Sequence, residues 1–276
     1  MSRIKKTVAA LGDNCVDIYP DLGLWYCTGN VVDFGVHMQR LGIPVSIITT
    51  TGNDSYGTAM RELFQREKLD TSHVQTAEGN TARSYMKLID KERIYDKWDG
   101  GVMDTISFSK EDIAFAKSHD LVHSAMWGNA HMHIPEIHNS GGLVSFDYAD
   151  EFLSDGFDVF EQTIEHVDFA FFSFQRDGDE ARDFLQHVVA RGPKIAVATF
   201  GSEGSLVWDG TVFIHCGIMP SNLVNTIGAG DSYIAGFMHG ILNGMDIADC
   251  MMQGASVAAE TVSVFGPWSE KQKGGI

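Results

Sequence analysis

Apolar residues at the start of the chain fall first into a short continuous run and then into a helical repeat. The run from Val8 to Leu11 predicts a buried strand that ends at Gly12. Positions 13–30, rich in Asp, Tyr, Trp and Gly, show neither pattern and predict an irregular segment. We expect a helix from about Asn30 to a stop at Gly42, because apolar residues recur there at helical spacing: Val31, Phe34, Met38 and Leu41.

A strand is expected next from Val45 to Thr50, and then a helix with an apolar face made of Tyr56, Met60, Leu63 and Phe64. Residues 81–98 have a different period. Apolar and polar side chains alternate there in steps of two, which predicts a half-exposed hairpin that turns at Asp90-Lys91-Glu92. A hairpin inserted into an alternation of strands and helices is typical of a flap.

The rest of the chain has the pattern of a parallel sheet covered on both faces. Ser109 and Asp112 have the spacing of a capping box, which predicts a helix through Lys117. Nearly continuous apolar runs alternate with helical stretches and predict buried strands at Leu121–Ala125, Leu143–Phe146, Val167–Phe172 and Ile195–Thr199.

The C-terminal third begins with a hairpin and continues as helices. Asp209-Gly210 lies between two short apolar runs and predicts the hairpin turn. Helices are expected from Asp231 to about Asn243, and from about 247 to 264. The whole pattern predicts one α/β domain over residues 1–268, followed by a polar tail at 269–276.

Charge and composition restrict the partners. The 276 residues include 20 basic and 37 acidic side chains, a formal net charge of −17. Such a chain should be repelled by nucleic-acid phosphates and by anionic membranes, so neither is expected as a partner. The N-terminus has no signal-peptide pattern, and the four cysteines include no Cys-x-x-Cys pair. A cytoplasmic protein with reduced thiols is expected.

The segment that carries chemistry runs from Asn225 to Ser232, with the sequence Asn-Thr-Ile-Gly-Ala-Gly-Asp-Ser. Gly228 and Gly230 let backbone N–H groups approach an anion, and the following helix adds the positive end of its dipole. Asp231, at the junction of loop and helix, is placed to accept a proton from an attacking hydroxyl. The alternative is a glycine-rich turn with an aspartate N-cap.

With these motifs the sequence resembles the ribokinase-like carbohydrate kinases of the PfkB family, from about Ala9 to Trp268. Gly-Ala-Gly-Asp is similar to the second signature of that family, and Gly29-Asn30 with the helix ending at Arg40-Leu41-Gly42 is similar to the first. The turn from Gly52 to Gly57 and the loop from Thr199 to Ser205 also look like family motifs. The resemblance implies a ribokinase-like, Rossmann-like three-layer α/β/α fold, with a central mostly parallel sheet and a small β lid.

The resemblance also implies roles for individual residues. Asp231 would be the general base, and Gly228, Ala229 and Gly230 would form an anion hole. The residues expected to contact ATP are Thr199, Gly201, Gly204 and Thr226. Those expected to contact a sugar are Asp13, Asp17, Gly29, Asn30, Asp33, Arg83 and Arg93. The segments at about 13–30 and 81–99 would form a lid, and such lids would pair two chains in a homodimer.

The sequence departs from the family pattern at four places. Thr28 stands where the first signature has a glycine, Asp33 where it has an asparagine, and Asn225 where the second signature has an aspartate. The family's Asn-x-x-Glu motif, tied to Mg²⁺ and phosphate handling, is absent from the aligned stretch Ser173-Phe174-Gln175-Arg176. Mg²⁺ is expected with ATP, but its ligands stay open, with Asp177, Asp179 and Glu180 as candidates.

A subgroup resemblance sharpens the expected substrate. The blocks Gly12–Pro20, His123–Ala130 and Phe265–Trp268 look like those of fructoselysine 6-kinases. An Amadori-type substrate phosphorylated at O6 would follow, with Arg83 and Arg93 facing its carboxylate, although solvated hairpin charges are the favoured interpretation of these two side chains. Two alternatives remain: a kinase of the same family for fructose, another ketose or a nucleoside, and a non-catalytic sugar sensor.

Overall fold

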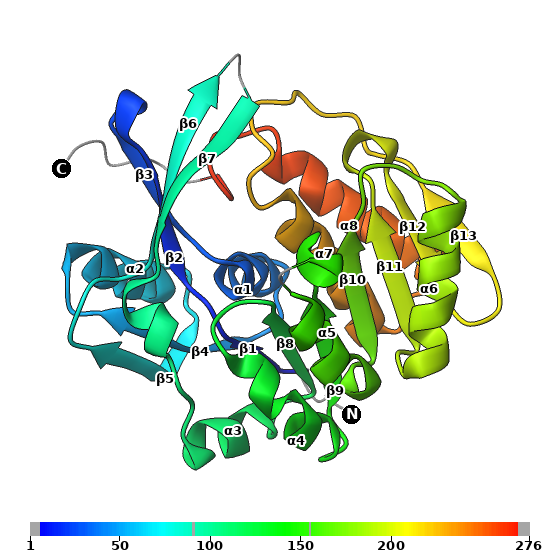
Figure 1. The fold of residues 1–276 in the computed structure, drawn as a ribbon, viewed down its shortest axis with the longest axis horizontal. Helices are drawn as coiled ribbons and strands as arrows, with labels where there is room; N and C mark the ends of the chain where they lie inside the picture. The colour runs from blue at the N-terminus through cyan, green and yellow to red at the C-terminus, as the bar shows by residue number, and fades with distance from the viewer. Residues whose placement is uncertain (1–5, 90–91, 155, 270–276) are drawn as a thin grey trace.

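The computed structural model describes residues 6–89, 92–154 and 156–269. Its larger sheet has nine strands in the order β13-β12-β11-β10-β9-β8-β1-β4-β5 (Figure 1). Neighbours from β5 to β11 pair in parallel, and β12 and β13 extend the sheet in antiparallel fashion. The strand bounds are β1 (Val8–Leu11), β4 (Val45–Gly52), β5 (Asp70–Ala77), β8 (Leu121–Ala125), β9 (Leu143–Asp147), β10 (Phe169–Ser173), β11 (Ile195–Thr199), β12 (Ser205–Trp208) and β13 (Phe213–Cys216).

Helices cover both faces of this sheet, which confirms the predicted three-layer fold (Figure 1). One layer consists of α1 (Asn30–Arg40), α2 (Ser55–Arg66), α7 (Ala229–Asn243) and α8 (Ile247–Thr261). The other consists of α3 (Lys110–Ala116), α4 (Ile134–His138), α5 (Phe157–Thr163) and α6 (Asp179–Arg191). The capping box predicted at α3 is present, with the Ser109 hydroxyl accepting from the Asp112 N–H.

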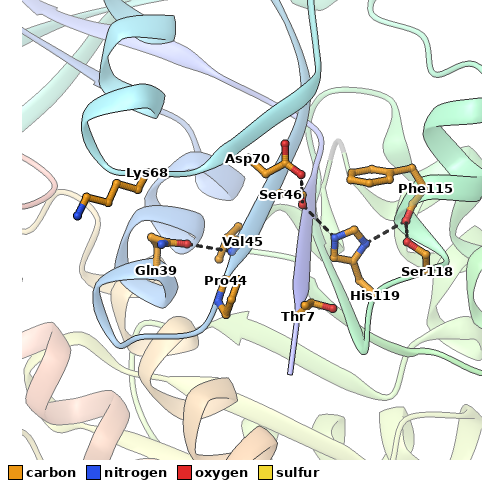
Figure 2. Close-up of a pocket in the computed structure, with 10 residues that line it drawn as sticks. All are labelled: Thr7, Gln39, Pro44, Val45, Ser46, Lys68, Asp70, Phe115, Ser118 and His119. Carbon is orange, nitrogen blue, oxygen red and sulfur yellow. Dashed lines mark hydrogen bonds between the residues drawn. The ribbon is translucent and has the colours of Figure 1, made fainter. Parts of the chain in front are cut away.

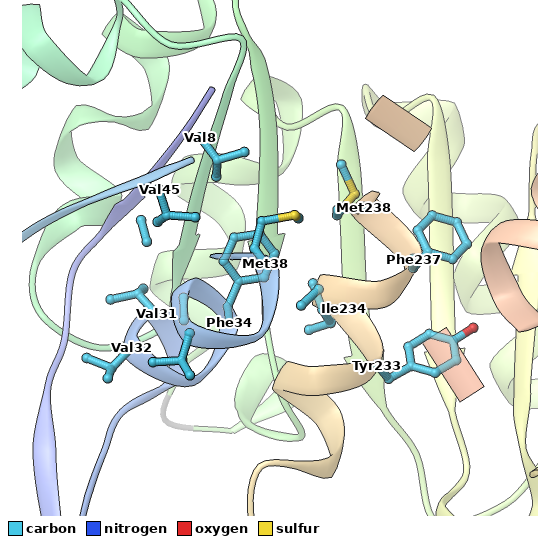
Figure 3. Close-up of a cluster of buried hydrophobic side chains, with 14 of the residues drawn as sticks. Val8, Val31, Val32, Phe34, Met38, Val45, Tyr233, Ile234, Phe237 and Met238 are labelled. Atoms are coloured by element: carbon cyan, nitrogen blue, oxygen red, sulfur yellow. The ribbon is translucent and has the colours of Figure 1, made fainter. Parts of the chain in front are cut away.

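The continuous apolar runs arise because the strands bury side chains on both faces. In β1, Val8 and Ala10 belong to the core on the α1 and α7 side, whereas Ala9 and Leu11 belong to the opposite core. Figure 3 shows the first of these cores, where side chains of α1 and α7 face each other next to the strands. Packing of α1 against α7 brings the amino ends of these two helices close to the same edge of the sheet.

A smaller sheet of four strands, in the order β3-β2-β6-β7, stands apart from the large one (Figure 1). Its strands are β2 (Cys15–Tyr19), β3 (Leu24–Thr28), β6 (Arg83–Ile89) and β7 (Glu92–Asp99). The two segments expected to form a lid therefore pair in one sheet, through β2 and β6. The expected turn at 90–91 and most of the expected tail, 270–276, lie outside the described residues.

Three predictions about elements were wrong. Residues 13–30 are not irregular, because β2 and β3 form an antiparallel ladder that gains a further partner in β6. Strand β5 was missed, since it is a polar edge strand with no apolar run. Helix α7 begins at Ala229 with Gly228 as its N-cap, so Asp231 lies inside the first turn and is not an N-cap. Among the described helices, none has the length and apolar character required to cross a bilayer.

Candidate active site

Aspartates from five segments of the chain meet at the carboxyl edge of the large sheet. Asp13 follows β1, Asp17 lies in β2, Asp33 lies in α1, Asp147 ends β9 and Asp231 lies in the first turn of α7. These carboxyl groups lie close enough to raise one another's pKa. Asp231, Asp17 and Asp13 raise the pKa of Asp33, and Asp147 and Asp13 raise the pKa of Asp231. Open α/β sheets bind ligands at this edge, so it is the candidate active site.

Asp13 connects the first strand to helix α1. Its carboxylate accepts hydrogen bonds from the backbone N–H groups of Asn30 (2.9 Å) and Val31 (3.3 Å), so it caps the helix from outside. Burial raises the pKa of Asp13 to about 6, although these backbone bonds lower it. Gly29, with φ of +128°, is required there because a Cβ would lie 2.7 Å from the Cα of Asn14.

Asp231 carries an oxygen that is free to act. Its Oδ1 is buried and accepts no hydrogen bond from any described residue. Burial raises the pKa of Asp231 well above its usual range, and the carboxyl groups of Asp147 and Asp13 raise it further. The Asn30 side chain donates through Nδ2 to Asp147 Oδ2 at 3.4 Å, and it also lowers the pKa of Asp231. Asn30 therefore lies close to both carboxyl groups.

Asp147 is the site residue that the sequence reading did not find. It ends β9, and its Oδ1 accepts from the Ala149 N–H at 2.9 Å. Burial raises the pKa of Asp147 to about 6. The available signal was a charged residue directly after a buried apolar run, at the edge where parallel strands end.

We expect Asp147→Asn to move the acid limb of the kcat/KM pH profile to lower pH. The Asp147 carboxylate raises the pKa of Asp231, so removing its charge lowers that pKa and leaves Asp231 ionised in more acidic solution. The measurement is the pH dependence of turnover for the wild type and the variant. An acid limb that stays in place, or moves to higher pH, contradicts the assignment of Asp231 as the titrating base.

The amino end of α7 has the form of an anion site. Gly228, the N-cap, has φ of +68°, and no side chain caps this end. Asn225 shapes the approach by accepting from the Ile227 N–H at 3.0 Å, and the Ala229 N–H donates to the Thr226 carbonyl at 3.3 Å. Uncapped first-turn N–H groups and the helix dipole favour a negative group here. Thr226 itself is exposed beside this turn.

A cavity of about 890 Å³ lies beyond the ends of β10 and β11, beside the start of α6. The stretch found in place of the family's Asn-x-x-Glu lines this cavity with Ser173, Phe174, Gln175 and Arg176. Four acidic side chains also line it: Asp150, Asp179, Glu180 and Glu203. Thr199 lies at its rim, 3.4 Å from the Ser173 hydroxyl. Gly204, with φ of +94°, has no room for a Cβ because the Cys216 carbonyl would collide with it. Gly201 has φ of +55° in the same loop.

The candidate metal ligands differ in availability. Asp177 is held by Arg182, whose Nη2 lies 2.9 Å from Asp177 Oδ2, while Asp179 and Glu180 line the cavity. No cluster of three or more His, Cys, Asp or Glu side chains suited to a metal occurs among the described residues. Asp179 and Glu180 could supply one or two carboxylate ligands, and the nucleotide phosphates would supply the others. Mg²⁺ is usually bound in this way in kinases.

The lid arginines occupy different positions. Arg83 donates to Asp54 Oδ2 at 3.1 Å and lies over the ring of Tyr56, so it ties the small sheet to α2, while its Nε has no partner in the described structure. Arg93 lies in β7, among the residues whose side chains are not described.

A second cavity, of about 410 Å³, lies at the opposite edge of the sheet (Figure 2). Its polar groups already bond to one another. His119 lies 3.0 Å from the Ser46 hydroxyl, which donates to Asp70 at 3.2 Å, and Gln39 accepts from the Val45 N–H. These bonds hold strands and helices together and leave no convergent set of free groups.

The fold and the carboxyl-edge site together define the class of protein. The structure is similar to Arabidopsis thaliana ribokinase complexed with ribose and ATP, with a TM-score of 0.81, 17% identity, and coverage of 95% of this chain and 94% of that chain. It is also similar to the nucleoside kinase of Methanocaldococcus jannaschii, with a TM-score of 0.78 and 18% identity over 95% of this chain and 93% of that one. Both comparisons show the ribokinase fold.

Sequence comparisons place the chain within that class. The model of the pfkB family of carbohydrate kinases matches residues 35–272. A fructoselysine 6-kinase of Shigella flexneri is 39% identical over 95% of this chain and 100% of its own length, and a fructosamine kinase of Bacillus subtilis is 29% identical over 93% and 91%. The chain therefore belongs to the pfkB family, and it is an ATP-dependent carbohydrate kinase, as the sequence motifs predicted.

Proposed function

We propose that this kinase transfers the γ-phosphoryl group of Mg-ATP to the O6 hydroxyl of fructoselysine, with Asp231 as the general base. The observation that carries the proposal is the unpartnered Oδ1 of Asp231 beside the uncapped amino end of α7. Full-length similarity to proteins described as fructoselysine 6-kinases supports the substrate. It disfavours a non-catalytic sensor, as well as fructose and nucleosides as main substrates.

In the proposed reaction, the substrate hydroxyl donates its proton to Asp231 Oδ1 while its oxygen attacks the γ-phosphorus. The bond from that phosphorus to the bridging oxygen of ADP breaks, and the negative charge on the transferring group faces the amino end of α7 at Gly228, Ala229 and Gly230. The raised pKa of Asp231 lets it hold the proton after transfer. Asp179 and Glu180, which line the cavity, would help to hold a Mg²⁺ ion bound with ATP, and that ion would supply neutralisation of phosphate charge.

The remaining predicted residues complete this assignment. ATP lies along Thr199, Gly201, Gly204 and Thr226, and the residues that bind the sugar substrate are Asp13, Asp17, Gly29, Asn30 and Asp33. The small sheet closes over the sugar and excludes water, which competes as a nucleophile. Exposed apolar side chains on β7, Tyr95 and Trp98, and Leu22 in the turn between β2 and β3 support pairing of two lids in a homodimer.

The test is ADP release from Mg-ATP with a panel of fructoselysine, glucoselysine, fructose, ribose and adenosine. We expect the highest kcat/KM with fructoselysine, and a product phosphorylated at O6 by NMR. A higher kcat/KM with another panel member would keep the kinase and reject the substrate. Sugar binding without turnover of any compound would favour the sensor.

A further inference from the structure

Asp33 has a carboxylate oxygen that nothing in the described structure satisfies. The side chain is only 1% exposed, and its Oδ2 accepts a hydrogen bond from the Thr28 hydroxyl at 2.8 Å. Oδ1 is buried and has no partner among the described residues. A buried carboxylate oxygen without a donor is unfavourable, and a ligand that supplies a donor would satisfy it.

The contact between Asp33 and Thr28 joins two departures from the family pattern. The family resemblance implies an asparagine and a glycine at these positions, where this chain has Asp33 and Thr28. The Thr28 hydroxyl orients the new carboxylate, because it bonds one oxygen and leaves the other for a ligand. The two residues therefore act as a pair, with Thr28 fixing the orientation of the Asp33 carboxylate.

Among the described residues, the charged groups closest in effect to Asp33 are carboxylates and not cations. Asp231, Asp17 and Asp13 are the charged neighbours with the largest effect on the pKa of Asp33, and all three raise it. Across the described part of the chain, Asp13, Asp33, Asp147 and Asp231 take part in no ion pair with Lys, Arg or His. A neutral sugar can donate hydroxyl hydrogens here, but it cannot balance the charge, whereas a cationic substrate does both.

We propose that Asp33 Oδ1 binds the secondary ammonium of an N-alkylated amino sugar, and that Asp33 thereby selects Amadori-type substrates over neutral sugars. The inference rests on the proposed function. In fructoselysine this nitrogen is bonded to C1 of the sugar, so it enters the site together with the ring hydroxyls. An N⁺–H donor to a carboxylate is a charge-assisted hydrogen bond, about twice as strong as a neutral one.

The test is the ratio of kcat/KM for fructoselysine to kcat/KM for fructose in wild type and Asp33→Asn. The variant restores the residue usual in the family and keeps the shape of the side chain. Loss of a hydrogen bond to a charged group predicts a fall in this ratio of about 10- to 100-fold. The matched control is Asp158→Asn, which removes the same charge from an exposed position in the first turn of α5, away from both lid segments, and should leave the ratio unchanged.

The outcomes separate this inference from the proposed function. An unchanged ratio in Asp33→Asn, with fructoselysine still turned over, would reject the ammonium contact alone. Equal losses for both substrates would also reject it, because Asp33 would then serve a hydroxyl common to both. A wild-type enzyme that turns over only neutral sugars would reject the inference together with the substrate. A melting temperature near that of the wild type shows that the variant is folded.

Discussion

Asp231→Asn is expected to lower kcat by about 10³-fold or more while fructoselysine still binds. The asparagine keeps the size of the side chain but cannot accept the hydroxyl proton, so the contribution of general base catalysis, typically 10²–10⁴-fold, is lost. Loss of one carboxylate from a crowded cluster also relieves repulsion with Asp147 and Asp13, so binding of a sugar should not weaken. The measurements are steady-state ADP release and calorimetric titration with the sugar.

The chain offers a matched control for this variant. Asp249 occupies the third position of α8, as Asp231 does in α7, so Asp249→Asn removes a first-turn carboxylate from an equivalent place on a helix dipole. The control should keep wild-type turnover. If Asp231→Asn keeps turnover within a few-fold of the wild type, another group takes the proton.

The core of the fold could be predicted because strands that are buried on both faces consist of continuous runs of apolar residues. Strands such as β8 and β11 are continuous apolar runs, and each was predicted at its observed bounds. The small sheet was harder to predict from the sequence. Strands β2 and β3 are stabilised by pairing with each other and with the distant β6, and this pairing leaves no periodic pattern in the local sequence. Edge strand β5 was not predicted because its mostly polar sequence has no apolar run.

The candidate site shows the same division between local and distant information. Motifs near Gly29 and Gly228 identified the two helix ends, since glycine-rich turns before helices have a recognisable local chemistry. The hydrogen bond from Asn30 to Asp147 joins residues more than a hundred positions apart, and only the fold brings Asp231 next to them. The roles predicted for individual residues stay predictions until variants are measured.

The second large effect is expected at Gly228, where alanine should lower kcat by about 10²-fold. With φ of +68°, an L side chain is strained there, and its Cβ would lie 3.0 Å from the Pro267 side chain and 3.2 Å from Asp33 Oδ2. Pro267 cannot retreat easily, because its carbonyl oxygen lies 3.0 Å from His37 Nε2. The first turn of α7 must therefore shift, and loss of a single donor to a transition-state oxyanion typically costs 10²–10³-fold.

The other end of the same helix separates this effect from strain alone. Gly244, the C-cap of α7, has φ of +73°, and a Cβ there meets nothing within 4 Å. Gly244→Ala should therefore lose a similar amount of stability, about 1–2 kcal/mol, and keep its turnover. Thermal denaturation and kcat measured for both variants decide the matter. If the two lose equal stability and both keep full turnover, the phosphoryl charge is stabilised by groups other than the first turn of α7.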